Sequence, residues 1–203
     1  MAKTLGALIF PGYELLDMFG PLEMFGMMGE EVEIRMVAQS SAPVASRQGP
    51  QTVVDDAFGD RDSYDMLLIP GGPGTRPEVG NPILIDWIKT MTSKAELTMT
   101  VCTGSALLAR TGLIDGKRAT SNKAAFKWVM EQGPKVDWVK QARWCEDGDI
   151  MTSSGVSAGM DMALAAIARE YSAEDAERVM NSTEYDWKRD PDWDPFAKIH
   201  GLV

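Results

Sequence analysis

The sequence predicts an α/β fold with a mostly parallel sheet and helices on both of its faces. Three observations support this prediction. Short apolar runs alternate with segments of helical spacing, the connections are short, and two runs end directly in glycine-rich or cysteine-containing turns. Such alternation is typical of βαβ units. With 203 residues, of which 44% are hydrophobic, we expect residues 1–203 to form a single domain.

Strands are predicted where apolar residues run together without helical spacing. The clearest runs are TLGALIF, EIRMVA, MLLI and LTMTV, which place strands at residues 4–10, 33–38, 66–69 and 97–101. Shorter pieces are expected at residues 118–120, 138–145 and 150–153, and an acidic turn at Asp147-Gly148 joins the last two. Val53 and Val54 are assigned to a small hairpin.

Helices are predicted at residues 82–92, 124–132, 158–170 and 173–182, with a short one beginning at residue 106. Residues 13–19 and 22–28 also have helical spacing. We expect a break between them at Gly20-Pro21, because proline disfavours helical geometry in the preceding residue. From about residue 185 the chain is irregular and aromatic. This tail is expected to lie against the domain or a partner subunit, and a loose tail is the alternative.

The composition argues against several classes of function. The net charge is -10 and no basic run is present, which disfavours nucleic-acid binding. No stretch approaches the ~20 apolar residues of a membrane span, and the first apolar stretch is too short for a signal peptide. Cys102 and Cys145 provide no disulfide framework, and no Cys/His spacing indicates a metal. We therefore expect a cytoplasmic protein that needs no cofactor.

Cys102 is the first candidate for chemistry. The strand at residues 97–101 runs directly into Cys102-Thr103-Gly104-Ser105, a sequence typical of a nucleophile elbow at the start of a helix. The helix N-terminus is expected to favour the thiolate, and the Thr103 N–H is expected to stabilise developing negative charge. The alternative is a structural cysteine that packs as a small hydrophobic side chain.

Gly71 and Gly72 follow the strand at residues 66–69. The carboxyl ends of parallel strands meet at one edge of a sheet, so this turn is expected near Cys102. Its N–H groups would then provide a second oxyanion donor. The alternative is a simple turn, since glycine clusters after strands are most often turns.

Asp17 is the leading candidate for the acid or base that works with Cys102. The only histidine is His200, near the end of the sequence, and we do not expect the tail to bring it into the site. Asp17 follows the first strand and is surrounded by apolar residues. Burial there would raise the pKa of its carboxyl and make it a proton donor near neutral pH. A solvated aspartate is the alternative, and Glu14 is the next candidate.

Four blocks of the sequence carry a resemblance: IFPGYELLDMFGPLEMF, LLIPGGPGT, VCTGSALLARTGLIDGKRATSN and MTSSGVSAGMDMAL. Together they resemble the DJ-1/ThiJ/PfpI superfamily over residues 4–185, and most closely its isocyanide hydratase-like subgroup. The resemblance implies a flavodoxin-like sandwich and a homodimer. It also implies Cys102 as nucleophile, Asp17 as its carboxyl partner, Thr103 next to it, Gly72 at the oxyanion site and Val156 in a loop near the cysteine.

The sequence departs from other branches of this superfamily. Its proteases and amidotransferases place histidine after the nucleophile or in a triad, whereas Thr103 follows here. Deglycase and glyoxalase members usually carry glutamate at Asp17, and the hydratases have His-Trp where this chain has Asn122-Lys123. The AraC-type regulators continue into a DNA-binding module, so a regulator role would need another protein.

The resemblance implies an enzyme that adds water to an isocyanide to form an N-substituted formamide. In this reading, Cys102 adds to the terminal carbon and Asp17 supplies the proton. The alternatives are a glyoxalase or deglycase acting on small carbonyl compounds, and a cysteine redox or ligand sensor.

Overall fold

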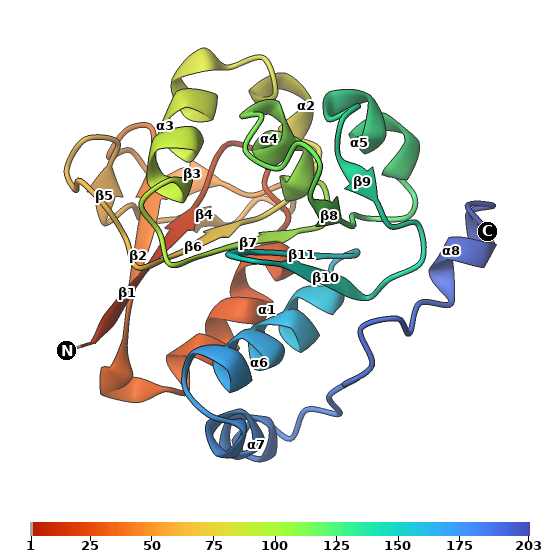
Figure 1. Ribbon diagram of the computed structural model, residues 1–203. Helices are drawn as coiled ribbons and strands as arrows, with labels where there is room; N and C mark the ends of the chain where they lie inside the picture. Colours follow the sequence, from red (N-terminus) through yellow and green to blue (C-terminus); the bar gives the residue numbers. More distant parts are fainter. Residues whose placement is uncertain (1) are drawn as a thin grey trace.

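A seven-stranded sheet runs through the centre of the molecule in the computed structural model, which describes residues 2–203 (Figure 1). Its strand order is β10-β11-β7-β6-β1-β2-β5, and every neighbouring pair is parallel except β10–β11. The strands are β1 Lys3–Leu8, β2 Val32–Ala38, β5 Asp56–Ala57, β6 Met66–Ile69, β7 Leu97–Val101, β10 Trp144–Asp147 and β11 Ile150–Ser153. Two small pairs lie outside this sheet: β3 Val44–Ala45 with β4 Gln51–Thr52, and β8 Arg118–Ala119 with β9 Asp137–Trp138.

Helices cover both faces of the sheet (Figure 1). Helices α1 and α6 lie on one face with α7 beyond them, and α3 and α4 lie on the other. The helices are α1 Leu15–Gly26, α2 Thr75–Glu78, α3 Pro82–Thr92, α4 Gly104–Arg110, α5 Phe126–Gln132, α6 Ala158–Glu170, α7 Ala173–Ser182 and α8 Phe196–Ile199, with a 3-10 turn, η1, at Gly29–Glu31. The predicted flavodoxin-like α/β sandwich is confirmed.

The central strands β6 and β7 are buried along their whole length. Strand β6 has apolar residues on both sides, and β7 alternates apolar residues with the buried Thr98 and Thr100, in a parallel sheet that helices cover on both faces. Strand β6 lies between β1 and β7, so the carboxyl ends of these three strands meet at one edge. The segments that follow them carry Asp17, Gly71 and Cys102. Among residues 2–203, no helix combines the length and the apolar character that crossing a bilayer requires.

Helix α1 corrects one prediction. It continues through Gly20-Pro21, where we expected a break. The reason is the packing of α1 against α6: a β-carbon on Gly20 would lie 2.9 Å from Met160 Cγ, and one on Gly159 would lie 3.1 Å from Pro21 Cγ. This close contact buries Gly20 and Pro21 and outweighs the local cost of proline within a helix.

The small hairpin also differs from the prediction. It pairs β3 with β4, and Val53 and Val54 lie outside it. Its position is set by backbone contacts with the loop after β1, because the Gly12 N–H donates to the Ala45 carbonyl over 2.9 Å and the Arg47 N–H donates to the Tyr13 carbonyl over 2.8 Å. The two adjacent valines therefore did not locate the hairpin, because contacts between distant segments decide its position.

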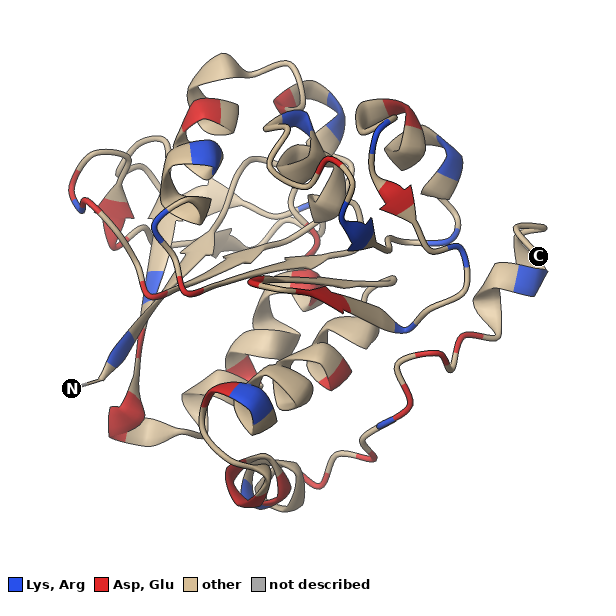
Figure 2. Ribbon diagram, in the orientation of Figure 1, with Lys and Arg blue, Asp and Glu red and all other residues tan. Residues whose placement is uncertain are grey.

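The tail beyond α7 lies against the domain, with acidic residues spaced along it (Figure 2). The indole of Trp187 donates to the Asp161 carbonyl over 3.1 Å, and the Arg143 N–H donates to the Pro191 carbonyl over 2.6 Å. Asp194 forms a buried ion pair with Lys123 at 3.1 Å. Of the two alternatives for the tail, the structure shows contact with this chain.

Candidate active site

Cys102 occupies the sharp turn between β7 and α4. Its φ is 56°, in the left-handed region that a non-glycine residue rarely adopts. The turn is held by its backbone, since the Cys102 N–H donates to the Ser154 carbonyl over 3.0 Å and the Cys102 carbonyl accepts from Ser121 Oγ over 2.8 Å. The strand-to-helix turn expected from the sequence is therefore present, with the side chain 7% exposed. Strain of this kind concentrates at functional sites.

Glycines bring the loop after β6 close to this turn. A β-carbon on Gly104 would lie 2.3 Å from the Ile69 carbonyl oxygen, and one on Gly71 would lie 2.5 Å from the Thr103 nitrogen. These two positions have no room for a side chain. Glycine is therefore what allows the two loops to approach each other so closely.

Asp17 is fully buried in the first turn of α1. Its Oδ2 accepts the Gly71 N–H over 2.9 Å. Burial raises the pKa of the Asp17 carboxyl from 3.8 to about 7, against the hydrogen bond from Gly71, while the charge of Glu14 raises it further and the Cys102 thiol lowers it. The carboxyl therefore exchanges its proton near neutral pH beside the cysteine.

The Cys102 thiol corrects another expectation. We expected the start of α4 to favour the thiolate, but burial raises the pKa of the thiol above its ordinary value, and the charge of Asp17 acts in the same direction. Hydrogen bonds from Thr103 and from the Val156 amide lower this pKa without reversing the shift. A neighbouring carboxylate and a dry environment outweigh the helix terminus.

Thr103 is held by a small network of hydroxyl groups. Its Oγ1 accepts the Gly72 N–H over 3.0 Å. The hydroxyl of Thr75, in α2, contacts Thr103 Oγ1 at 3.1 Å and donates to the Gly72 carbonyl over 2.7 Å. The Thr103 hydroxyl donates to the Gly72 carbonyl over 3.3 Å, and its contact with the Cys102 sulfur lowers the pKa of the thiol. The sequence reasoning missed Thr75, for which no local pattern gives a signal.

The predicted oxyanion donors need revision. The Gly71 N–H is bound by Asp17 and the Gly72 N–H by Thr103, so neither amide is free. The amides near the sulfur are those of Thr103 and Val156. Val156 has a φ of 38°, an unusual value for a β-branched residue, and this conformation belongs to the turn that brings its N–H toward the sulfur.

A cavity of about 360 Å³ opens over Cys102. Gly72, Thr103 and Val156 line it together with the cysteine, and its other lining residues are Glu14, Arg47, Pro73, Arg76, Asn122 and Ala124. The sequence analysis did not single out Arg47 or Arg76. Both come from loops and short elements that are far from Cys102 in sequence.

The tail approaches this cavity more closely than we expected. Phe196 and His200 line a neighbouring cavity of about 240 Å³, whose walls include Asn122, Ala124 and Val156 from the Cys102 cavity. His200 is not among the residues that line the cavity over Cys102. The carboxyl of Asp17 is an acid–base group in direct contact with the Cys102 thiol.

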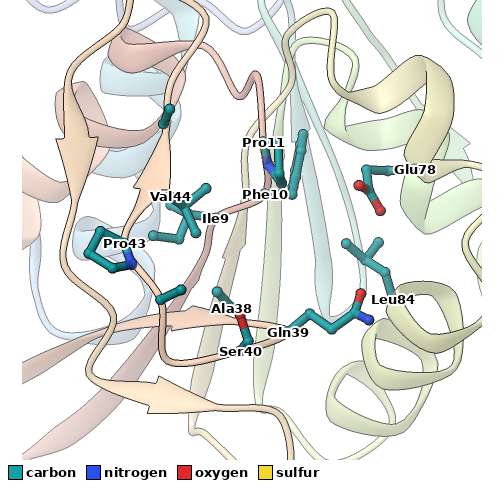
Figure 3. Close-up of a pocket in the computed structure, with 12 residues that line it drawn as sticks. Ile9, Phe10, Pro11, Ala38, Gln39, Ser40, Pro43, Val44, Glu78 and Leu84 are labelled. Atoms are coloured by element: carbon teal, nitrogen blue, oxygen red, sulfur yellow. The ribbon is translucent and has the colours of Figure 1, made fainter.

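A larger cavity of about 510 Å³ lies elsewhere, between β3 and α3 (Figure 3). Its walls are mostly apolar, with Ile9, Phe10, Val44 and Leu84 among them, and Glu78 at one side. Its lining includes no cysteine, and its hydroxyl group is that of Ser40. The chemistry of the side chains therefore places the candidate site at the smaller cavity over Cys102.

Comparison with known proteins agrees with this geometry. Residues 3–169 match the DJ-1/PfpI family. The chain belongs to the DJ-1/PfpI family. A family relative, isonitrile hydratase of Pseudomonas putida, is 32% identical over 187 residues, which cover 91% of this chain and 79% of that protein. The transcriptional regulator CdhR of Pseudomonas aeruginosa is 25% identical over 183 residues, and the match covers 88% of this chain and 54% of the regulator.

A solved structure supports the same DJ-1/PfpI assignment. The ThiJ/PfpI family protein from Pseudomonas syringae superimposes with a TM-score of 0.85 at 29% identity, over 92% of this chain and 76% of that one. The relatives of this chain thus include a hydratase and a regulator. The choice between these functions depends on the residues of the site.

Proposed function

We propose that this chain is a cysteine-dependent hydratase that converts an isocyanide to an N-substituted formamide. The observation that carries the proposal is the buried pair of Cys102 and Asp17, with a carboxyl pKa of about 7 and no histidine lining the cavity. An isocyanide carbon accepts a nucleophile and a proton at the same atom. One thiol and one proton carrier are sufficient for that chemistry. The similarity to isonitrile hydratase, isonitrile being another name for isocyanide, supports the choice.

In the first step, the Cys102 sulfur forms a bond to the terminal carbon of R–NC. The thiol proton passes to the Asp17 carboxylate and then to the same carbon, which gives the thioimidate R–N=CH–S–Cys102. Asp17 ends the step in the charge state in which it began. The Thr103 and Val156 amides stabilise the negative charge on sulfur while the proton is in transit.

In the second step, water adds to the thioimidate carbon. Collapse of the adduct breaks the C–S bond and releases R–NH–CHO, and the thiol regains a proton. Asp17 takes one proton from the attacking water and returns it to the departing sulfur, and the second water proton moves from the added oxygen to the nitrogen, so the site is restored. The net reaction is the addition of one water to one isocyanide.

The test is formamide formation from p-nitrophenyl isocyanide by the purified protein. We expect Cys102→Ala to abolish turnover and Asp17→Asn to reduce it by at least about a hundredfold, the lower end of the usual contribution of a general acid or base. Cys145→Ala is the matched control, because Cys145 lies in β10 and does not line the cavity. An absence of turnover with every isocyanide tried would contradict the proposal.

A glyoxalase-type activity is the second candidate, since a thiol beside a carboxyl also suits addition to a small carbonyl compound. Lactate formed from methylglyoxal by the same preparation, in the absence of isocyanide hydration, would favour this reading. A redox or ligand sensor is the third, favoured by the regulators among the relatives. Cysteine oxidation requires thiolate character, so intact mass after mild peroxide, compared with Cys102→Ser, tests this reading.

We further propose that the functional form is a homodimer. Leu16, Phe19 and Met27 lie on one side of α1 and at its C-terminal end, and are 41%, 42% and 37% exposed. Grouped exposed apolar side chains mark interaction surfaces. Sedimentation equilibrium is expected to give twice the chain mass, and Phe19→Glu is expected to give the monomer.

A further inference from the structure

Arg76 is a cation at the mouth of the Cys102 cavity whose role the proposed reaction leaves open. It belongs to the short helix α2, directly after the Gly72–Gly74 turn, and lines the same cavity as Cys102 and Thr103. Cys102 is close enough for its charge to act on the pKa of Arg76, against the effect of burial. A negatively charged group in the cavity would therefore be attracted to Arg76.

The guanidinium of Arg76 is held in place. Its central carbon lies 3.4 Å from the centre of the Trp128 ring, and its Nη1 donates to Thr75 Oγ1 over 3.2 Å. Stacking covers one face of the guanidinium and leaves donors along its edge. Within residues 2–203, no carboxylate lies within 4.0 Å of it. Arg76 is thus positioned but has no anionic partner.

The other charges of the cavity decide which anion fits. Arg47 and Glu14 line the same cavity and form an ion pair with each other at 3.4 Å. With that pair neutral overall, the residues that line the cavity carry one net positive charge, that of Arg76. A single carboxylate matches this charge, whereas a doubly charged phosphate would remain half unpaired and would lie near Glu14.

We propose that Arg76 selects substrates that carry a carboxylate, binding it at the mouth of the cavity while the reacting carbon meets Cys102. This inference rests on the proposed hydratase function for the identity of the reacting group, and the preferred substrate is then an isocyanide with a carboxylate on its R group. Arginine binds a carboxylate through two parallel N–H donors, which fixes the orientation of the substrate as well as its charge.

The first test compares 4-isocyanobenzoate with 4-isocyanobenzamide, which have nearly the same shape and differ in charge. We expect kcat/KM to favour the benzoate, and Arg76→Gln to reduce the benzoate-to-benzamide ratio by about tenfold or more. Arg110→Gln is the matched control, because Arg110 ends α4 and lines a different cavity. Arg76→Lys is expected to keep part of the preference. A ratio unchanged by Arg76→Gln would overturn the inference.

The second test needs no isocyanide. Iodoacetate and iodoacetamide both alkylate Cys102 by the same displacement of iodide, and peptide mass spectrometry separates this product from that of Cys145. Arg76→Gln is expected to lower the ratio of the iodoacetate rate to the iodoacetamide rate by about tenfold, while Arg110→Gln leaves it as in the wild type. A fall in this ratio without any isocyanide turnover would support anion selection and reject the hydratase. Isocyanide turnover with both ratios unchanged by Arg76→Gln would support the hydratase and reject anion selection by Arg76.

Discussion

At the scale of single residues, the site depends on a carboxyl that is kept out of water. Asp17 Oδ2 accepts the Gly71 N–H, the Cys102 thiol is the other hydrogen-bond neighbour of the carboxyl, and Oδ1 is buried without a backbone or hydroxyl donor in the described part of the chain. A charge in that position costs free energy, which is why the pKa rises. The same cost keeps a proton available beside Cys102 near neutral pH.

This residue predicts a pH dependence of stability. The native state binds the Asp17 proton more tightly than the unfolded chain, with a pKa of about 7 against 3.8, so the free energy of unfolding falls as pH rises between these values. The full penalty, on the order of 4 kcal/mol, is present above pH 7 and absent below pH 4. Asp17→Asn removes it. Urea unfolding is expected to show Asp17→Asn gaining stability over the wild type as pH rises from 5 to 8. A difference that does not change with pH would contradict this assignment.

At the scale of elements, the contact between α1 and α6 holds the acid over the nucleophile. Gly20 and Pro21 of α1 pack on Gly159 and Met160 of α6, one turn beyond Asp17. Helix α6 begins just after Val156, so this contact connects the carboxyl to the loop that supplies an amide to the sulfur. The helix pair therefore sets the geometry of the site as well as the stability of that face.

The prediction at this scale concerns Gly159→Val. A β-carbon there would lie 2.9 Å from Val101 Cγ2, and Val101 directly precedes Cys102. We expect a loss of about 1–3 kcal/mol in the free energy of unfolding, because the neighbours are stiff. Formamide formation should fall further than stability explains, since both α1 and the end of β7 must shift. Ala168→Val, near the far end of α6, is the control. Equal kcat/KM values for the two variants would show that the contact does not position the site.

At the scale of the whole molecule, one buried ion pair and a hydrogen bond to a second ion pair attach the tail to the domain. Arg143 and Asp161 lie 2.6 Å apart, and Asp161 also accepts the Lys188 N–H over 2.9 Å. Lys123 contacts Asp194 at 3.1 Å and donates to Thr120 Oγ1 over 2.7 Å. These contacts place Phe196 and His200 in the lining of the cavity that neighbours the one over Cys102. The last part of the chain thereby forms part of the surroundings of the site.

Asp194→Asn tests this attachment. It leaves the Lys123 ammonium buried without its carboxylate, which is expected to cost about 3 kcal/mol of stability and to loosen the tail. Limited proteolysis should then cut beyond residue 185 faster than in the wild type. The double variant Lys123→Met with Asp194→Leu, which removes both charges, is expected to recover most of the stability. If the double variant is as unstable as Asp194→Asn, the unpaired Lys123 charge is not what destabilises Asp194→Asn.

Much of the fold was predictable because it depends on local patterns. Apolar runs located β6 and β7, helical spacing located α3, α6 and α7 at their observed bounds, and a strand running into Cys102-Thr103-Gly104 identified the turn at the nucleophile. Period and turn residues act over a few neighbours, so they can be read from a sequence. The continuous α1 and the pairing of β3 with β4 were missed, because contacts between distant segments decide them.

By itself, the sequence determined the α/β class, the cysteine at a strand-to-helix turn and the absence of a histidine near it in the chain. Only the tertiary structure decided that the Gly71 and Gly72 amides are bound by Asp17 and Thr103, that Thr75 orders Thr103, and that Arg76 stacks on Trp128. It also decided the direction of the Cys102 pKa. The physical reason is that hydrogen-bond partners and burial depend on which distant segments meet, and solvent exclusion sets the charge state of every group enclosed there.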